Sequence, residues 1–143
     1  MKRGFVLFFP ILCFGVLKAQ SIKPPPPLIF TCVSWRVVVK DDKGLFETNS
    51  DWAVNNVRIS LDLNTKKMVV YSEHELTFDF MVEAGIYKND FGSWAKWETA
   101  LDNEGKRATI RLLNYGSMQK GGYSHTLYID YSDKTIQMNI YSN

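Results

Sequence analysis

Apolar and polar residues alternate along most of the chain after position 28. In the C-terminal stretch HTLYIDYSDKTIQMNIYSN, this alternation puts one apolar set on a single face: Leu127, Ile129, Tyr131, Ile136, Met138 and Ile140. A period of two residues is typical of half-buried strands. With Asp133 and Lys134 in the turn, Tyr131 would lie opposite Ile136, and the other apolar pairs follow from that register. The stretch therefore predicts an antiparallel hairpin.

The same alternation recurs in TCVSWRVVV (31–39), VRISLDLNTKKMVVYS (57–72), LTFDFMV (76–82) and WAKWETALDNEGKRATIRLLN (94–114). In the first of these it places five residues on one face: Thr31, Val33, Trp35, Val37 and Val39. Gly44 and Gly105 stand where tight turns need a left-handed backbone. No amphipathic helix of useful length is visible. We therefore predict an all-β fold, a single antiparallel meander of about eight or nine short strands that forms a small barrel or a two-sheet sandwich.

One short motif bears on the form of a barrel. The stretch FGSW contains Gly92-x-Trp94, which resembles the Gly-x-Trp motif of lipocalins, a family of ligand-carrying barrels. In that family the motif opens the first strand, whereas here it lies past the middle of the chain. The resemblance therefore implies lipocalin-like closure as one form of the barrel, and it carries no site residue or ligand across.

The N-terminus has the layout of a secretory signal peptide. MKR supplies positive charge, GFVLFFPILCFGVL is an apolar run of 14 residues, and Ala19 offers a small residue for cleavage. The run is shorter than the about 20 residues of a bilayer span. We predict a signal peptide at 1–19, a Pro-rich extended tether at 20–28 and an all-β domain at 29–143. Retention of the signal as an uncleaved anchor is the alternative, and no membrane span is expected after cleavage.

Cleavage would remove the basic excess. The 17 basic residues include three within 1–20, so 14 would remain against 15 acidic ones. A mature chain with this balance gives no electrostatic argument for nucleic acid as a partner. Cys32 would be the single remaining cysteine, so an internal disulfide is not expected, and burial as a small apolar residue is favoured over pairing with another chain. The signal, the missing disulfide and the lack of an Asn-x-Ser/Thr site favour an exported bacterial protein, periplasmic or at the cell surface or extracellular.

The sequence shows no recognised catalytic or metal-binding pattern, and we expect no cofactor. Glu73, His74 and Glu75 are consecutive, so in an extended segment they point to alternate sides. We interpret them as a solvated connection between strands rather than a metal site. Ser124 and His125 are adjacent, which does not make a nucleophile and a base meet.

The aromatic residues give the candidate binding surface. Opposite the apolar face of the C-terminal hairpin lies a polar face, on which Tyr128 would pair with Asn139 and Asp130 with Gln137. Aromatic rings beside amides and carboxylates suit sugar recognition, although exposed sheets also carry such residues for packing. Trp94 and Trp97 are three residues apart, so they should face opposite sides of a strand. The candidate binding residues are Tyr128, Asp130, Gln137, Asn139, Tyr141, Trp94 and Trp97.

These features favour a small exported non-catalytic binding domain. Its partner would be a glycan, a small apolar molecule in a barrel mouth, or an envelope protein. The alternative is a structural or accessory component of a cell-envelope assembly, held through a strand edge. A polysaccharide or cell-wall hydrolase is a third hypothesis, because 15 acidic residues could supply a carboxylate pair.

Overall fold

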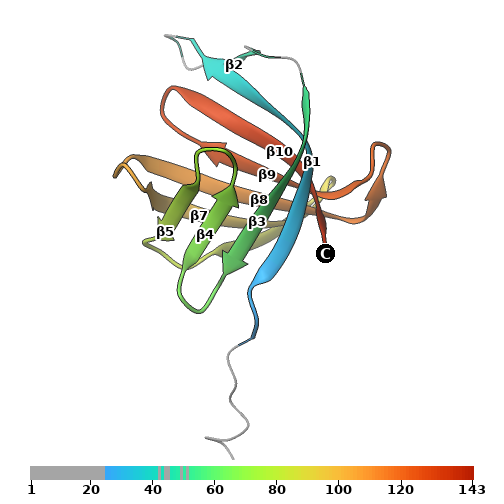
Figure 1. Ribbon diagram of the computed structural model, residues 1–143, viewed down its shortest axis with the longest axis horizontal. Helices are drawn as coiled ribbons and strands as arrows, with labels where there is room; N and C mark the ends of the chain where they lie inside the picture. The colour runs from blue at the N-terminus through green and yellow to red at the C-terminus, as the bar shows by residue number, and fades with distance from the viewer. Residues whose placement is uncertain (1–24, 42, 44–45, 49, 51) are drawn as a thin grey trace, which may run out of the picture.

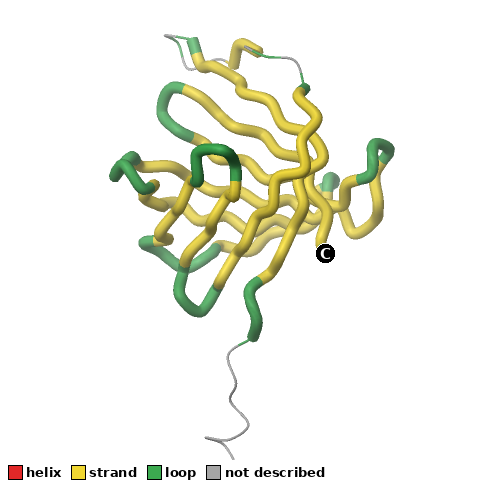
Figure 2. Tube along the Cα trace, viewed as in Figure 1, coloured by secondary structure: helices red, strands yellow, loops and turns green. Residues whose placement is uncertain are grey.

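The computed structural model describes residues 25–41, 43, 46–48, 50 and 52–143. The predicted signal peptide and most of the predicted tether lie outside the described residues. All regular elements of the described part are β-strands, joined mostly by short turns (Figure 2). These residues include no helix with the length and apolarity that a membrane crossing needs.

The described residues form ten strands. They are β1 (Leu28–Lys40), β2 (Phe46–Thr48), β3 (Ala53–Asp62), β4 (Lys67–Tyr71), β5 (Leu76–Phe80), β6 (Gly85–Asn89), β7 (Gly92–Asp102), β8 (Arg107–Gln119), β9 (Tyr123–Asp130) and β10 (Lys134–Ser142). The pairs are antiparallel and run in the order β10-β9-β8-β7-β5-β4-β3-β1. β1 also pairs with β10 along most of its length, which closes the sheet.

The fold is therefore a closed eight-stranded antiparallel barrel with two extra strands (Figure 1). This result confirms the all-β meander and selects the barrel over the sandwich. β2 pairs with the end of β1 and extends beyond the barrel. β6 pairs with the first half of β7, while β5 pairs with its second half, so β5 and β6 together act as one interrupted strand.

One face of the barrel strands fills the interior. The largest fully buried apolar side chains are Phe78, Ile59, Met68, Ile110, Ile129, Ile140 and Cys32. The predicted burial of Cys32 is confirmed, and burial raises the pKa of its thiol to about 11. The thiol is therefore neutral and inert at ordinary pH.

The predicted face of β1 is wrong in its first half. A β-bulge between Cys32 and Ser34 shifts the register, so Phe30 and Cys32 point inward before it and Trp35 after it. Thr31 instead lies on the outside, where its hydroxyl donates to the side chain of Asn143 at 2.9 Å. A bulge adds one residue to the strand and switches the alternation, which a strict two-residue period does not reveal.

The last hairpin has the predicted faces but not the predicted register. Ile129 pairs with Ile136 rather than with Met138, and Tyr128 with Gln137 rather than with Asn139. The turn residues are Ser132 and Asp133, because the amide of Tyr131 donates to the carbonyl of Lys134 at 2.8 Å. A turn displaced by one residue moves the pairing by two positions, so each side chain keeps its side of the sheet.

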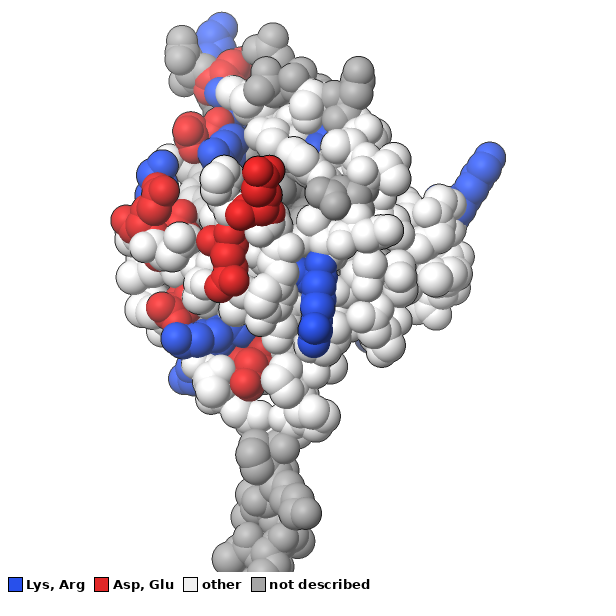
Figure 3. Space-filling model, viewed as in Figure 1, with Lys and Arg blue, Asp and Glu red and all other residues white. Residues whose placement is uncertain are grey.

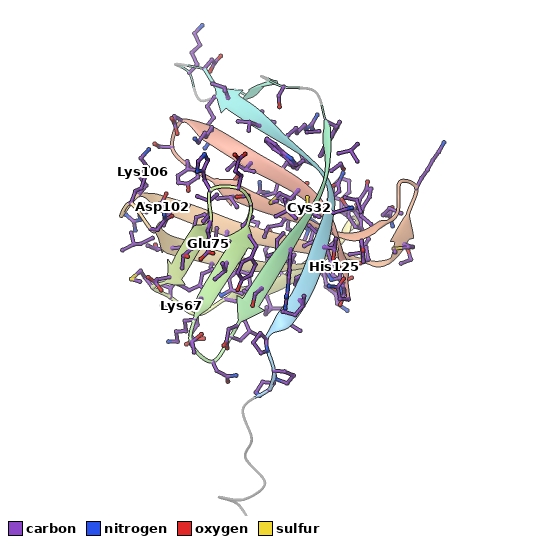
Figure 4. All side chains as sticks on the ribbon, viewed as in Figure 1. Cys32, Lys67, Glu75, Asp102, Lys106 and His125 are labelled. Atoms are coloured by element: carbon purple, nitrogen blue, oxygen red, sulfur yellow. The ribbon has the colours of Figure 1, made fainter. Side chains whose placement is uncertain are left out.

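Bonds from the rest of the barrel hold that turn. Tyr131 Oη donates to Asp102 Oδ2 at 2.8 Å, and the amide of Lys40 donates to the carbonyl of Asp133 at 3.0 Å. Oδ1 of Asp102 also accepts the amides of Glu104 and Lys106, at 2.9 and 2.8 Å. Figure 4 shows Asp102 beside Lys106 at the β7–β8 turn. Asp102 therefore ties this turn to the turn between β9 and β10.

These bonds make the stability depend on pH. Desolvation acts to raise the pKa of Asp102, but the hydrogen bonds from Tyr131 and from the amides of Lys106 and Glu104 outweigh it and lower the pKa. Because the folded pKa is below the unfolded value of about 3.9, the stabilisation is present above that pH and is lost as the pH falls through the folded pKa.

We therefore predict that Tyr131→Phe lowers the free energy of unfolding by about 1–2 kcal/mol at pH 7. The difference from the parent should shrink as the pH falls through the folded pKa of Asp102, because protonation weakens the same bond in the parent. Urea unfolding at pH 7 and at a series of acidic pH values measures this. Tyr71→Phe is the control, because Tyr71 is exposed. A loss for Tyr131→Phe that stays the same over the whole acidic series would contradict the assignment.

Candidate functional site

An apolar cavity lies inside one end of the barrel. Its volume is about 180 Å³, and its lining comes from β1, β3, β4, the β4–β5 turn, β5, β9 and β10: Trp35, Val57, Val70, Ser72, Leu76, Ile129, Ile136 and Met138. Ser72 is the polar member, and its hydroxyl already donates to the carbonyl of His74 at 2.7 Å. We call this space the mouth cavity. Its walls are apolar apart from this engaged hydroxyl and the indole N–H of Trp35.

The rest of the interior is filled by side chains. Trp97 is 4% exposed and stacks on Phe80, with ring centroids 4.6 Å apart and planes 11° apart. Trp97 therefore packs in the core and lies apart from the other nominated residues. The predicted opposition of Trp94 and Trp97 is confirmed, since Trp94 lies on the outside of the same strand.

The outside of β7, β8, β9, β10 and β1 carries the other nominated residues, and we call it the outer wall. Trp94 is only 8% exposed there, because its ring stacks with Tyr87 at 5.9 Å and with Tyr128 at 5.8 Å. Its indole N–H donates to Asn89 Oδ1 at 2.9 Å. The indole is therefore covered by neighbouring aromatic rings and has little surface left for a ligand.

Asp130 is held by a bidentate ion pair. Arg111 Nε and Nη2 donate to its two carboxylate oxygens at 2.6 and 3.2 Å, and Thr135 Oγ1 donates to Oδ1 at 2.7 Å. The guanidinium also lies 4.3 Å from the ring centroid of Tyr128. Arg111 thus neutralises Asp130 and supports the half-buried ring of Tyr128.

Thr126, Asn139 and Ser34, beside this pair, are linked by side-chain hydrogen bonds. Thr126 Oγ1 donates to Asn139 Oδ1 at 3.1 Å, and Asn139 Nδ2 donates to Ser34 Oγ at 3.1 Å. Thr126 is 0% and Asn139 8% exposed. Gln137 and Tyr141 are half-buried on the same wall, where they pair with Arg36 and Thr31 of β1. Asn139 therefore fixes neighbouring strands, and a ligand has little access to its amide.

The outer wall thus brings together six of the seven nominated residues: Tyr128, Asp130, Gln137, Asn139, Tyr141 and Trp94. Their role in binding stays a prediction. Sequence reasoning missed Arg36, Arg111 and Tyr87, which contact these residues, and Trp52, whose ring lies against Arg36. The two arginines alternate with apolar residues on their strands, and this alternation could have predicted that they lie on the outer wall. Trp52 lies between β2 and β3, and Tyr87 lies on β6. The alternation of apolar and polar residues did not predict where these segments pack.

An open groove of about 640 Å³ runs past the β9–β10 turn and contains three carboxylates, of Glu98, Asp130 and Asp133. Asp130 is held by Arg111 as described, and Glu98 pairs with Lys96 at 3.0 Å. The groove therefore supplies no argument for the hydrolase hypothesis. In the view of Figure 3, acidic and basic side chains are interspersed, and no large single-sign patch is visible.

The histidines lie far from any cluster of ligands. Glu73, His74 and Glu75 are all exposed at the β4–β5 turn. His125 is half-buried with its ring edge-on to Phe30 at 5.2 Å, and burial lowers its pKa. Among the residues described, no group of three or more His, Cys, Asp or Glu side chains could hold a metal ion.

No protein-family model, curated protein or solved structure matches this chain. The geometry of the barrel alone therefore carries the functional argument.

Proposed function

We propose that the protein is a small non-catalytic binding domain that takes a small apolar ligand, or the apolar end of a larger one, into the mouth cavity. One observation carries the proposal: a closed barrel with a cavity of about 180 Å³, lined almost entirely by apolar side chains, at one end. Barrel mouths are recurrent ligand sites. An apolar cavity of similar size, about 150 Å³, stays dry and binds benzene in another protein.

The size of the cavity limits the ligand. Drug-sized molecules use pockets of roughly 300–1,000 Å³, so the cavity suits a single ring or a short alkyl chain. A glycan is disfavoured here because the only polar side-chain groups of the lining are one engaged hydroxyl, of Ser72, and one indole N–H, of Trp35. On the outer wall, Trp94 and Asn139 are too buried to provide the platform and the amide that sugar recognition needs. We also propose that the protein is exported through its signal peptide and acts in the periplasm or outside the cell.

A series of n-alkanols of increasing length tests this proposal. Each added CH₂ should strengthen binding about fourfold, since burying one is worth about 0.8 kcal/mol, until the chain fills the cavity and the gain stops. The emission of Trp35, which lines the cavity, reports binding.

Two tryptophan substitutions on β5 give a matched pair. Leu76→Trp should fill the cavity and abolish binding, because Leu76 lines it. Thr77→Trp, on the neighbouring position that points outward, should bind like the parent. Equal binding by both variants, or affinity that ignores chain length, would overturn the proposal.

An assembly role is the second candidate, and the free edge of β6 favours it. Within the described chain, β6 pairs with β7 alone. Ile86 on β6 and Phe91 in the turn that follows it are 74% and 69% exposed. Exposed apolar edges can accept a strand from another chain, and charged residues on them prevent it.

If β6 is used in this way by a second copy, the chain should form dimers that Ile86→Lys disrupts, while Val54→Lys, at an exposed site on β3, leaves them intact. Sedimentation velocity measures this, and a parent that stays monomeric at all concentrations would exclude self-pairing through β6.

A further inference from the structure

Arg36 is a half-buried cation on the outer wall that lacks an acidic partner among the described residues. Its Nε donates to Gln137 Oε1 at 3.0 Å, and its guanidinium carbon lies 4.6 Å from the ring centroid of Trp52. Both of these partners are neutral. None of the ion pairs within the described residues includes Arg36. Its two terminal amino groups, Nη1 and Nη2, donate to no described residue.

Arg111 on the same wall differs from Arg36 because it forms an ion pair with a carboxylate. Register places the two arginines in one row, with Gln137 and Tyr128 between them. Arg111 neutralises Asp130 through two hydrogen bonds, whereas no acidic side chain in the described part of the chain compensates the charge of Arg36. Burying a charge is costly without a counter-charge, so the site of Arg36 favours an anion.

The surroundings hold the guanidinium in a fixed orientation. Gln137 holds Nε, and the Trp52 ring covers one face of the guanidinium. Among the described residues no buried side-chain nitrogen lacks a hydrogen-bond partner, so Nη1 and Nη2, which have none, reach solvent and are accessible to a ligand. Desolvation raises the pKa of Tyr128, and the charges of Arg111 and Arg36 oppose this rise. Arg36 therefore lies close enough to act on the Tyr128 hydroxyl. Trp52 is itself 39% exposed and offers a flat apolar surface beside the cation.

We propose that Arg36 anchors a small monocarboxylate on the outer wall, with the carboxylate accepting hydrogen bonds from Nη1 and Nη2 and a flat apolar group of the ligand lying against Trp52. The planar fork of arginine matches a carboxylate through two parallel bonds. Arg36, Arg111 and Asp130 together leave one positive charge, which a single carboxylate balances. A phosphate dianion would exceed it. This site is on the opposite side of the barrel wall from the mouth cavity and does not depend on the function proposed for it.

Benzoate is the probe, and titration calorimetry on the full chain at low salt gives its affinity. Benzoate should bind more tightly than acetate, which lacks the ring, and benzyl alcohol, which lacks the charge, should not bind at this site. Phenyl phosphate that binds more tightly than benzoate would contradict the carboxylate assignment. The Leu76→Trp variant should bind benzoate like the parent, and a loss of binding there would place the probe in the mouth cavity instead.

Arg36→Gln should weaken benzoate about tenfold or more, because a charge-assisted bidentate pair is lost. Arg58→Gln is the matched control, since Arg58 also lies over an aromatic ring, that of Tyr71 at 5.9 Å, but is exposed. Trp52→Ala supplies a second variant: it should weaken benzoate and leave acetate unchanged. Unchanged benzoate affinity in Arg36→Gln, an equal loss in Arg58→Gln, or no effect of Trp52→Ala would overturn the proposal.

Discussion

Replacing Phe78 by alanine should lower the free energy of unfolding by about 3–5 kcal/mol. Phe78 is 0% exposed, on the short strand β5, and its ring lies 6.5 Å from that of Tyr131 across the interior. Truncation would remove the apolar transfer energy of the ring and leave a cavity that the closed barrel cannot collapse around. Small domains are stable by only about 5–15 kcal/mol, so the loss would be a large part of the total.

Urea unfolding followed by tryptophan emission measures this change. Phe91→Ala is the matched control, since Phe91 is 69% exposed and its truncation should change stability by no more than about 0.5 kcal/mol. A Phe78→Ala variant as stable as Phe91→Ala would mean that β5 does not pack its inward face into a dry interior.

Replacing Gly92 by alanine should cost about 2–5 kcal/mol, from backbone strain and overpacking together. Gly92 opens β7 with a φ of +150°, and a Cβ there would press on the carbonyl oxygen of Asn114 and lie 3.1 Å from its carbonyl carbon. Because the obstacle is backbone of β8, the two strands would have to separate. The displacement would act directly on Trp94, two residues further along, and on its stacking with Tyr128.

Gly105→Ala is the control that distinguishes backbone strain from a steric clash of the added Cβ. Gly105 also has a positive φ, of +80°, but a Cβ there meets no atom within 4 Å. Its substitution should cost only the about 1–2 kcal/mol of a left-handed residue. Thermal and urea unfolding of both variants measure the difference, and near-ultraviolet circular dichroism reports the packing of Trp94. Equal losses for the two glycines would show that β7 and β8 do not approach as closely as described.

The alternation of side chains predicted the fold class because most strands have one dry face and one wet face. The C-terminal hairpin shows both the success and its limit. Leu127, Ile129 and Met138 are buried as expected, but the turn lies one residue earlier. The bonds that hold this turn reach Asp102 and Lys40, which are distant in sequence, so local pattern could not place it.

The local alternation could not predict the bulge in β1 either. Nor could it predict that β5 and β6 share the pairing with β7. A bulge at Val33 reverses the alternation within a continuous run of apolar residues, where either face looks suitable for the core. β6 lies outside the alternating stretches from which the strands are predicted. It is a strand through pairing with β7, and all of its residues are exposed.

The candidate site was predicted in part. The polar face of the last hairpin is real, but the exposure of its residues depends on what covers them. Tyr87 from β6 covers Trp94, and Trp52 lies on Arg36, and neither approach follows from the pairing of sequence neighbours. The mouth cavity is lined from strands distributed around the barrel, so it becomes visible only once β1 is seen to pair with β10.

Intermolecular nuclear Overhauser effects between n-hexanol and the methyl groups of the chain test the mouth cavity most directly. The account predicts cross-peaks to Val70, Ile136 and Met138, which line the cavity. It predicts none to Val54, which is 90% exposed on the outside of β3. Cross-peaks confined to exposed methyl groups, or none at saturating alcohol, would contradict a ligand-binding barrel.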